Sequence, residues 1–127
     1  MIRVALAEDH PEMLLALRLL LKLSRDVELV CEATNGQQAL DCVQSHQPDV
    51  LVMDIRMPVL DGLAATRKLV ALGMKTRVIL VSSYRGGYIV MQASGVGAVG
   101  YVPKERVPSD LLPAIEAVHR GETFFVE

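Results

Sequence analysis

The sequence predicts an α/β fold built on a doubly wound parallel sheet. Three short apolar runs contain no polar residue, which is typical of strands that helices cover on both faces. These runs are Val4-Ala5-Leu6-Ala7, Val50-Leu51-Val52-Met53 and Val78-Ile79-Leu80-Val81. Longer amphipathic segments separate the runs, so that strands and helices alternate along the chain. Five such units in series, joined by right-handed crossovers, give a five-stranded sheet with five helices.

The expected strands are Ile2–Ala7, Val27–Ala33, Val50–Asp54, Val78–Ser82 and Val99–Val102. In the second of these, apolar residues alternate with Glu28 and Glu32, a pattern that favours the edge of a sheet. With 127 residues, the chain fits one domain with a sizeable core.

The expected helices are Pro11–Leu23, Gly36–Ser45, Leu63–Leu72, Tyr88–Ala93 and a last one that begins after Ser109 and ends at Gly121. Ser109 is a good N-cap for the last helix. Several glycines flank the fourth, so we expect it to be short or mobile. Gly62, just before the third, is interpreted as a turn residue.

Composition and charge narrow the functional classes. Apolar residues make up 51% of the chain, charged residues 22%, and the net charge is −2. Because no cluster of Lys and Arg is present, we expect this segment not to bind nucleic acid itself. The longest apolar stretch, Met13–Leu23, is short and broken by charges, and the chain starts without a signal pattern, so we expect a cytoplasmic protein with no membrane contact.

The two cysteines have neither a metal-type spacing nor a CxxC pattern. Cys31 falls in a predicted strand and Cys42 in a predicted helix. We therefore expect two small thiols that are buried or half-buried.

Acidic residues follow two of the predicted strands. Glu8 and Asp9 come directly after the first strand, and Asp54 ends the third. In a parallel sheet these carboxylates converge at the edge where ligands bind. At about 4 Å and an effective dielectric constant of about 20, each pair repels by roughly 4 kcal/mol. Such a cluster indicates a cation, and oxygen ligands of this kind suit Mg²⁺.

Further motifs complete the set. Asp54 stands within Met53-Asp54-Ile55-Arg56-Met57-Pro58, Ser82 ends the fourth strand, and Gly100-Tyr101-Val102-Pro103-Lys104 surrounds the fifth. With Glu8-Asp9 and Asp61-Gly62, this order and spacing resembles the receiver domain of two-component response regulators over the whole chain. The resemblance implies a flavodoxin-like sheet of strand order 2-1-3-4-5.

The resemblance also implies roles for the residues. Asp54 would accept a phosphoryl group from a sensor histidine kinase, and Lys104 would pair with a phosphoryl oxygen. The ligands of Mg²⁺ would be Glu8, Asp9, Asp54 and the backbone carbonyl of Arg56. Ser82 and Tyr101 would respond to the phosphoryl group.

The expected output is a changed surface on the fourth helix, fifth strand and fifth helix. That change would control homodimerisation or an output domain rather than catalyse a reaction. Arg56 and Tyr84 would tune the lifetime of the phosphoryl group by limiting the access of water.

The sequence departs from the common receiver pattern after Lys104. Many receivers have a proline there, whereas this chain has Glu105, which could compete locally for Lys104. A lysine followed by a residue other than proline resembles the branch of receivers that is joined to a C-terminal helix-turn-helix domain. The final Arg120-Gly121-Glu122-Thr123-Phe124-Phe125 resembles the end of receivers in that branch. We therefore expect a receiver domain over residues 1–121, and at 122–127 the start of a linker to a DNA-binding domain.

Two alternatives remain open on the sequence. The chain could be an interaction module of the same fold that is not phosphorylated, although the intact acidic set and Lys104 argue against this. It could instead be an enzyme of similar architecture. The loop after the first strand is acidic and would repel a flavin phosphate. Arg56 occupies the position where phosphohydrolases with an aspartyl nucleophile place their general acid.

Overall fold

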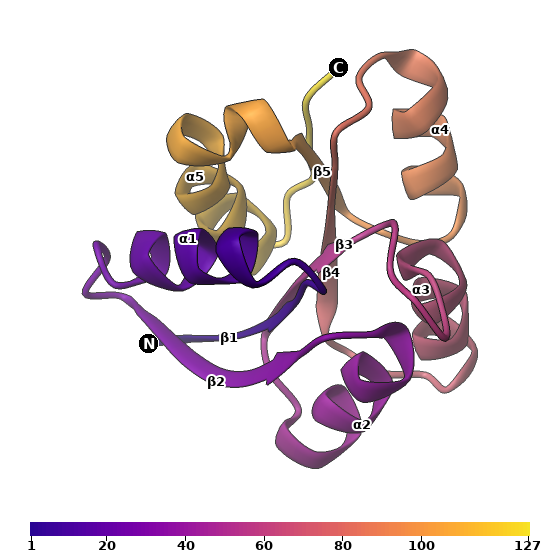
Figure 1. The fold of residues 1–127 in the computed structure, drawn as a ribbon, viewed down its shortest axis with the longest axis horizontal. Coiled ribbons are helices and arrows are strands. Elements are labelled where there is room, and N and C mark those ends of the chain that lie inside the picture. The colour runs from indigo at the N-terminus through magenta and orange to yellow at the C-terminus, as the bar shows by residue number, and fades with distance from the viewer.

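The computed structural model describes residues 1–127 as a parallel sheet with helices on both faces (Figure 1). Its elements are β1 (Ile2–Ala7), α1 (Pro11–Leu21), β2 (Val27–Ala33), α2 (Gly36–His46), β3 (Val50–Asp54), α3 (Gly62–Ala71), β4 (Arg77–Ser82), α4 (Gly87–Gly95), β5 (Gly100–Pro103), a 3₁₀ turn (Lys104–Arg106), α5 (Val107–His119) and β6 (Phe124–Phe125). The strand order is β2-β1-β3-β4-β5-β6. The predicted fold class and the order 2-1-3-4-5 are therefore confirmed.

The sheet separates two apolar cores. One lies between the sheet and α2, α3 and α4, and includes Leu51, Met53 and Leu80. The other lies beneath α1 and α5, and includes Leu6, Leu17 and Ile115. Consecutive residues of β1, β3 and β4 alternate between these cores, which explains why their sequences are apolar throughout. None of the helices has both the length and the apolar character needed to cross a membrane.

A sixth strand extends the sheet beyond the five that were predicted. Phe124 and Phe125 pair in parallel with Gly100 and Tyr101 of β5. The amide of Phe124 donates to the carbonyl of Val99 over 3.0 Å. A two-residue strand is too short to show a periodic pattern in the sequence, and the segment was interpreted as linker.

The last helix begins earlier than the sequence indicated. The 3₁₀ turn leads directly into α5 at Val107, and Ser109 lies within the first turn instead of capping it. Pro108 accounts for the difference, because its fixed φ favours the first turn of a helix and it needs no hydrogen-bond partner there. The fourth helix is longer than the predicted Tyr88–Ala93, since α4 runs from Gly87 to Gly95.

Gly62 permits a close approach of two backbones, not the turn that was expected. It is the first residue of α3, and its φ is not in the left-handed region. A Cβ atom at this position would lie 2.3 Å from the carbonyl oxygen of Asp54. The amide of Gly62 also donates to the carbonyl of Ile55 over 2.7 Å. Glycine thus lets α3 begin directly against the end of β3.

The two cysteines form a disulfide, so the prediction of two free thiols is wrong for this structure. Cys31 of β2 and Cys42 of α2 are bonded, with a Cα–Cα distance of 6.1 Å. Helix α2 packs on the sheet beside β2 with Leu40 and Val43 buried, and this places Cys42 over the strand. The sequence spacing gave no sign of this pairing because it depends on how α2 sits on the sheet.

We predict that Gly62→Ala lowers the free energy of unfolding by roughly 1–3 kcal/mol, since the added methyl group must displace backbone. Gly95→Ala is the matched control, because a Cβ atom there would meet nothing within 4 Å. This control should leave stability unchanged or raise it by up to about 1 kcal/mol. Urea denaturation measures both, and equal effects of the two substitutions would contradict the close-approach explanation.

Candidate functional site

Three carboxylates converge at the carboxyl ends of β1 and β3, as the sequence predicted. These strands are parallel neighbours, with Ala7 opposite Met53. One oxygen each from Glu8, Asp9 and Asp54, together with a ring nitrogen of His10, lie within 4.8 Å of one another. Glu8 is fully buried, Asp54 is 2% exposed, and Asp9 is half-buried. The acids are thus held close together and largely away from water.

Lys104 reaches these acids from the end of β5. Its Nζ donates to Asp54 Oδ2 over 3.0 Å and lies 3.1 Å from Glu8 Oε1. The contact with Glu8 has the distance of an ion pair but not the geometry of a hydrogen bond, and Glu8 Oε1 and Asp9 Oδ1 have no hydrogen-bond partner. Buried oxygens without donors are suited to a cation. The donor set therefore fits Mg²⁺.

The surroundings shift two pKa values at this site. Burial raises the pKa of the Glu8 carboxyl above its ordinary value, and the charge of Asp54 adds to the effect, while the backbone amide of His10 and the ammonium of Lys104 act against it. For Lys104, burial lowers the pKa, but the hydrogen bond with Asp54 and the negative charges of Asp54 and Glu8 outweigh it, so its pKa is raised. Lys104 is thus held as a cation, whereas the negative charge of ionised Glu8 is only partly compensated by its neighbours.

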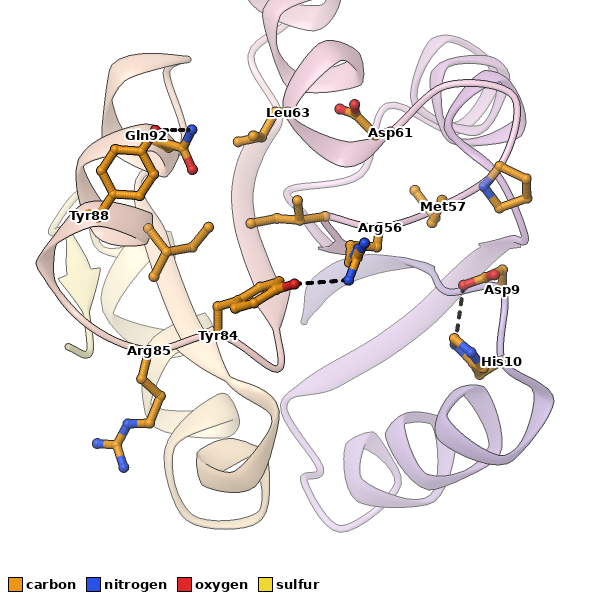
Figure 2. A pocket seen from close by; sticks show the side chains of 13 residues that line it. Asp9, His10, Arg56, Met57, Asp61, Leu63, Tyr84, Arg85, Tyr88 and Gln92 are labelled. Atoms are coloured by element: carbon orange, nitrogen blue, oxygen red, sulfur yellow. Dashed lines mark hydrogen bonds and ion pairs between the residues drawn. The ribbon is translucent and has the colours of Figure 1, made fainter.

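His10 contacts two acids of the cluster directly. Its Nδ1 lies 3.3 Å from both Glu8 Oε2 and Asp9 Oδ1. Its backbone amide also donates to Glu8 Oε2 over 3.2 Å. Figure 2 shows the imidazole beside Asp9 at the start of α1.

Arg56 and Tyr84 meet across the entrance to the site. The guanidinium of Arg56 donates to the hydroxyl of Tyr84 over 3.0 Å, and its Cζ lies 5.6 Å from the centre of the tyrosine ring. The two side chains face each other in Figure 2, on the wall of a cavity of about 980 Å³ that also includes Asp9, Met57 and Tyr88. The backbone amide of Arg56 donates to Asp54 Oδ1 over 3.3 Å. The sequence indicated these two side chains as a pair that limits the access of water, but it did not show that they contact each other.

Ser82 and Tyr101 lie behind this entrance. Ser82 is buried at the end of β4, and its hydroxyl accepts from the amide of Tyr84 over 3.3 Å. Tyr101 on β5 is fully buried, and its hydroxyl donates to the carbonyl of Tyr84. Both side chains therefore hold the backbone of the segment that leads from β4 to α4.

Glu105 does not compete for Lys104. Its carboxylate pairs instead with the guanidinium of Arg85 over 3.0 Å. Arg85 also donates to the carbonyl of Glu127 over 3.0 Å. Sequence reasoning did not single out Arg85, because its partners are distant along the chain.

The chain belongs to the family of response regulator receiver domains, whose sequence model matches residues 4–116. It is 40% identical over 125 residues to the transcriptional regulatory protein DesR of Bacillus subtilis, covering 98% of this chain and 62% of DesR. It is 32% identical over 124 residues to the nitrate/nitrite response regulator protein NarL of Escherichia coli, covering 98% of this chain and 57% of that protein. The chain thus spans about three-fifths of the length of these curated relatives.

Solved structures show the same fold. The signal receiver domain of the response regulator NarL from Mycobacterium tuberculosis matches with a TM-score of 0.91 and 33% identity, over 95% of this chain and 98% of that one. A LuxR-family two-component response regulator from Aurantimonas sp. SI85-9A1 also matches with a TM-score of 0.91, at 30% identity over 96% of this chain and 87% of that one. The fold and the two-component assignment predicted from the sequence are confirmed.

We predict that Glu8→Gln raises the melting temperature in buffer without divalent cations at pH 7. Because the pKa of Glu8 is raised in the folded state, its ionised form destabilises the fold once the pH exceeds the ordinary pKa of 4.5. The gain should therefore diminish as the pH falls from the raised pKa toward 4.5, and it should be absent below 4.5. Thermal unfolding followed by circular dichroism measures it.

Glu28→Gln serves as the matched control, since Glu28 is exposed on β2. It should leave the melting temperature nearly unchanged at every pH. A loss of stability in Glu8→Gln at pH 7 would show that the ion pair with Lys104 outweighs burial of the carboxylate.

Proposed function

We propose that this chain is a phosphorylation-controlled switch in which Asp54 accepts a phosphoryl group from a sensor histidine kinase. The observation that carries the proposal is the buried Asp54 carboxylate, hydrogen-bonded to Lys104 over 3.0 Å and flanked by two further acids. An isolated surface aspartate would have neither the cation nor the cluster. Membership of the receiver family supports the same assignment.

The carboxylate of Asp54 acts as the nucleophile. One of its oxygens attacks the phosphorus of the kinase phosphohistidine, the phosphorus–nitrogen bond breaks, and an acyl phosphate forms on Asp54. Lys104 stays close enough to pair with a phosphoryl oxygen, and its raised pKa keeps it charged. Glu8, Asp9, Asp54 and the backbone carbonyl of Arg56 would hold Mg²⁺. The bound ion would offset the negative charge of the incoming group.

Ser82 and Tyr101 carry the response from Asp54 to the surface. When the Ser82 hydroxyl turns to a phosphoryl oxygen, it gives up its contact with the amide of Tyr84. The segment after β4 then shifts, and Tyr101 is bonded to the same segment. A shift there changes the surface of α4, β5 and α5, which in our proposal controls homodimerisation or an output domain.

The output we propose is transcriptional. Relatives such as DesR are named as transcriptional regulatory proteins, and the present chain spans 62% of that protein. Residues 122–127 would lead from the receiver to a C-terminal DNA-binding domain. We infer a cytoplasmic location, where kinase and DNA are both accessible, and a regulatory role without enzymatic turnover.

We predict that incubation with Mg²⁺ and a small acyl phosphate adds about 80 Da to the intact chain, the mass of one phosphoryl group. Asp54→Ala should abolish the gain. Asp41→Asn should leave it intact, because Asp41 is exposed on α2, away from the site. Intact-mass spectrometry measures all three, with an EDTA-treated sample to test the need for the cation. No gain in the unaltered chain would favour an interaction module that is not phosphorylated.

We predict that replacing both Arg56 and Tyr84 with alanine shortens the lifetime of the aspartyl phosphate several-fold. The two side chains are joined by a hydrogen bond and a cation–π contact, and we infer that together they limit the access of water to Asp54. Decay of the phosphorylated fraction, followed by mass, measures the lifetime. Tyr84→Phe keeps the ring but loses the hydroxyl, so it separates shielding from hydrogen bonding. An unchanged lifetime in the double variant would contradict the proposal that these side chains limit the access of water.

A further inference from the structure

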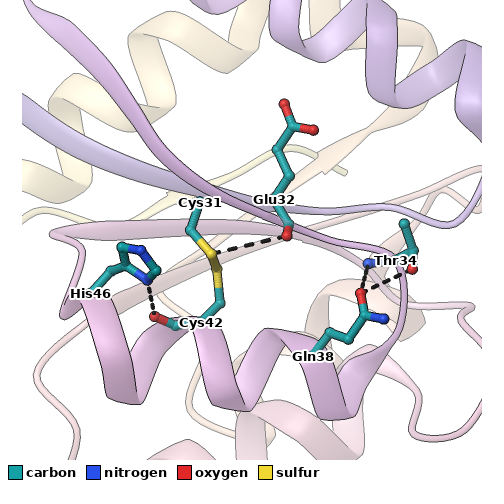
Figure 3. Close-up of a disulfide and its surroundings, with 6 residues drawn as sticks. All are labelled: Cys31, Glu32, Thr34, Gln38, Cys42 and His46. Atoms are coloured by element: carbon teal, nitrogen blue, oxygen red, sulfur yellow. Dashed lines mark hydrogen bonds between the residues drawn. A yellow bond between two sulfur atoms is a disulfide. The ribbon is translucent and has the colours of Figure 1, made fainter.

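The Cys31–Cys42 disulfide lies apart from the phosphorylation site and has no part in it. Figure 3 shows that it joins the strand β2 to the helix α2 that follows it. The two residues are 11 positions apart, and their Cα atoms are 6.1 Å apart, within the range of native disulfides. The fold therefore places the two sulfur atoms where a bond can form without moving the backbone.

The two cysteine residues differ in their exposure to solvent. Cys42 is 4% exposed within the core beneath α2, whereas Cys31 is only half-buried on the outermost strand of the sheet. An incoming reagent can thus reach Cys31 first. Cys42 is already in place to react with it from the protein side.

A histidine lies beside the pair. His46 follows Cys42 by one helical turn, and one of its ring nitrogens and the two sulfur atoms are all within 4.8 Å of one another. Its Nδ1 lies 3.2 Å from the carbonyl oxygen of Cys42, which orients the ring (Figure 3). A protonated imidazole next to a thiol favours the thiolate, the form that reacts in thiol–disulfide exchange.

Contacts other than the disulfide also hold β2 and α2. Strand β2 is paired with β1 from Val27 to Ala33, with one register shift at Val30. Helix α2 is anchored by buried Ala39, Leu40 and Val43. Because both elements are held without the bond, the chain can exist in a reduced and an oxidised form.

We propose that Cys31 and Cys42 form a reversible redox site that exchanges with small disulfides of the glutathione class. The Cys31 thiolate attacks one sulfur of oxidised glutathione, giving a mixed disulfide and releasing one glutathione thiolate. The Cys42 thiolate then attacks the Cys31 sulfur and displaces the second. Two electrons pass from the protein to glutathione, and the protons of the two thiols are released to solvent and to the leaving thiolates. A dithiol reductant reverses both steps. Disulfides in reducing compartments are commonly of this transient kind.

The disulfide would fix α2 more firmly between β2 and the loop after β3. Gly36, the first residue of α2, packs so closely on this loop that a Cβ atom would lie 2.0 Å from the carbonyl oxygen of Leu60. Oxidation should therefore slow amide hydrogen exchange in α2. It should also raise the melting temperature by about 5–10 °C, since it closes a short loop in the unfolded chain.

The test equilibrates the chain in glutathione buffers of graded ratio with EDTA present, then quenches with acid and alkylates free thiols. Mass spectrometry should show one transition in which both thiols disappear together, and dithiothreitol should restore them. Cys42→Ala should stop at the mixed disulfide of Cys31 with glutathione, and Cys31→Ser should not form the internal disulfide. Neither variant should show the rise in melting temperature. Asp54→Ala should retain both the transition and the rise, which keeps this test independent of phosphorylation.

Three results would overturn the proposal. Two thiols that stay reduced in oxidised glutathione would show that the pair does not exchange. A disulfide that persists in dithiothreitol in the folded chain would show a permanent structural link. Protection of the reduced thiols by equimolar Zn²⁺, lost in His46→Gln but kept in the control His119→Gln, would show a metal site made of two cysteines and a histidine instead.

Discussion

The contact between Lys104 and the buried carboxylates is the interaction on which the rest of the site depends. Three acids meet at the ends of β1 and β3, and one ammonium reaches two of them. Each close pair of acids repels by roughly 4 kcal/mol at an effective dielectric constant of about 20. Burial raises the pKa of Glu8, and the charge of Asp54 adds to the effect, because one cation cannot compensate three anions. Glu8 Oε1 and Asp9 Oδ1 also have no hydrogen-bond partner. The negative charge that stays uncompensated makes the cluster suited to a further cation.

Much of this arrangement follows from the sequence, because it rests on strand ends in a parallel sheet. The bounds of β1, β2 and β3 agree with the predicted ones, since a polar residue marks the carboxyl end of each strand. The acids at those ends were predicted for the same reason. What could not be predicted depends on how separate segments pack. Arg56 meets Tyr84 across 28 positions, Arg85 meets Glu105 across 20, and Cys31 meets Cys42 because α2 lies over β2.

Local backbone preferences explain the remaining differences. The sequence suggested Ser109 as a helix cap, yet Pro108 starts α5 earlier because its backbone is already suited to the first turn. Gly62 was interpreted through turn chemistry, while its role is to leave room for the carbonyl of Asp54. In both cases the residue type is compatible with two structural roles. The packing around the residue determines which of the two roles it has.

Tyr84 links three elements around the acidic cluster through three different groups. Its amide donates to the Ser82 hydroxyl, its carbonyl accepts from Tyr101, and its own hydroxyl accepts from Arg56. These partners belong to the end of β4, to β5 and to the loop after β3. A movement of the backbone at Tyr84 therefore alters all three contacts together. Such coupling lets a small change at Ser82 reposition the entrance to the site and the neighbouring surface in one step. Access of water to Asp54 and the signal to a partner would then change together, because one residue takes part in both.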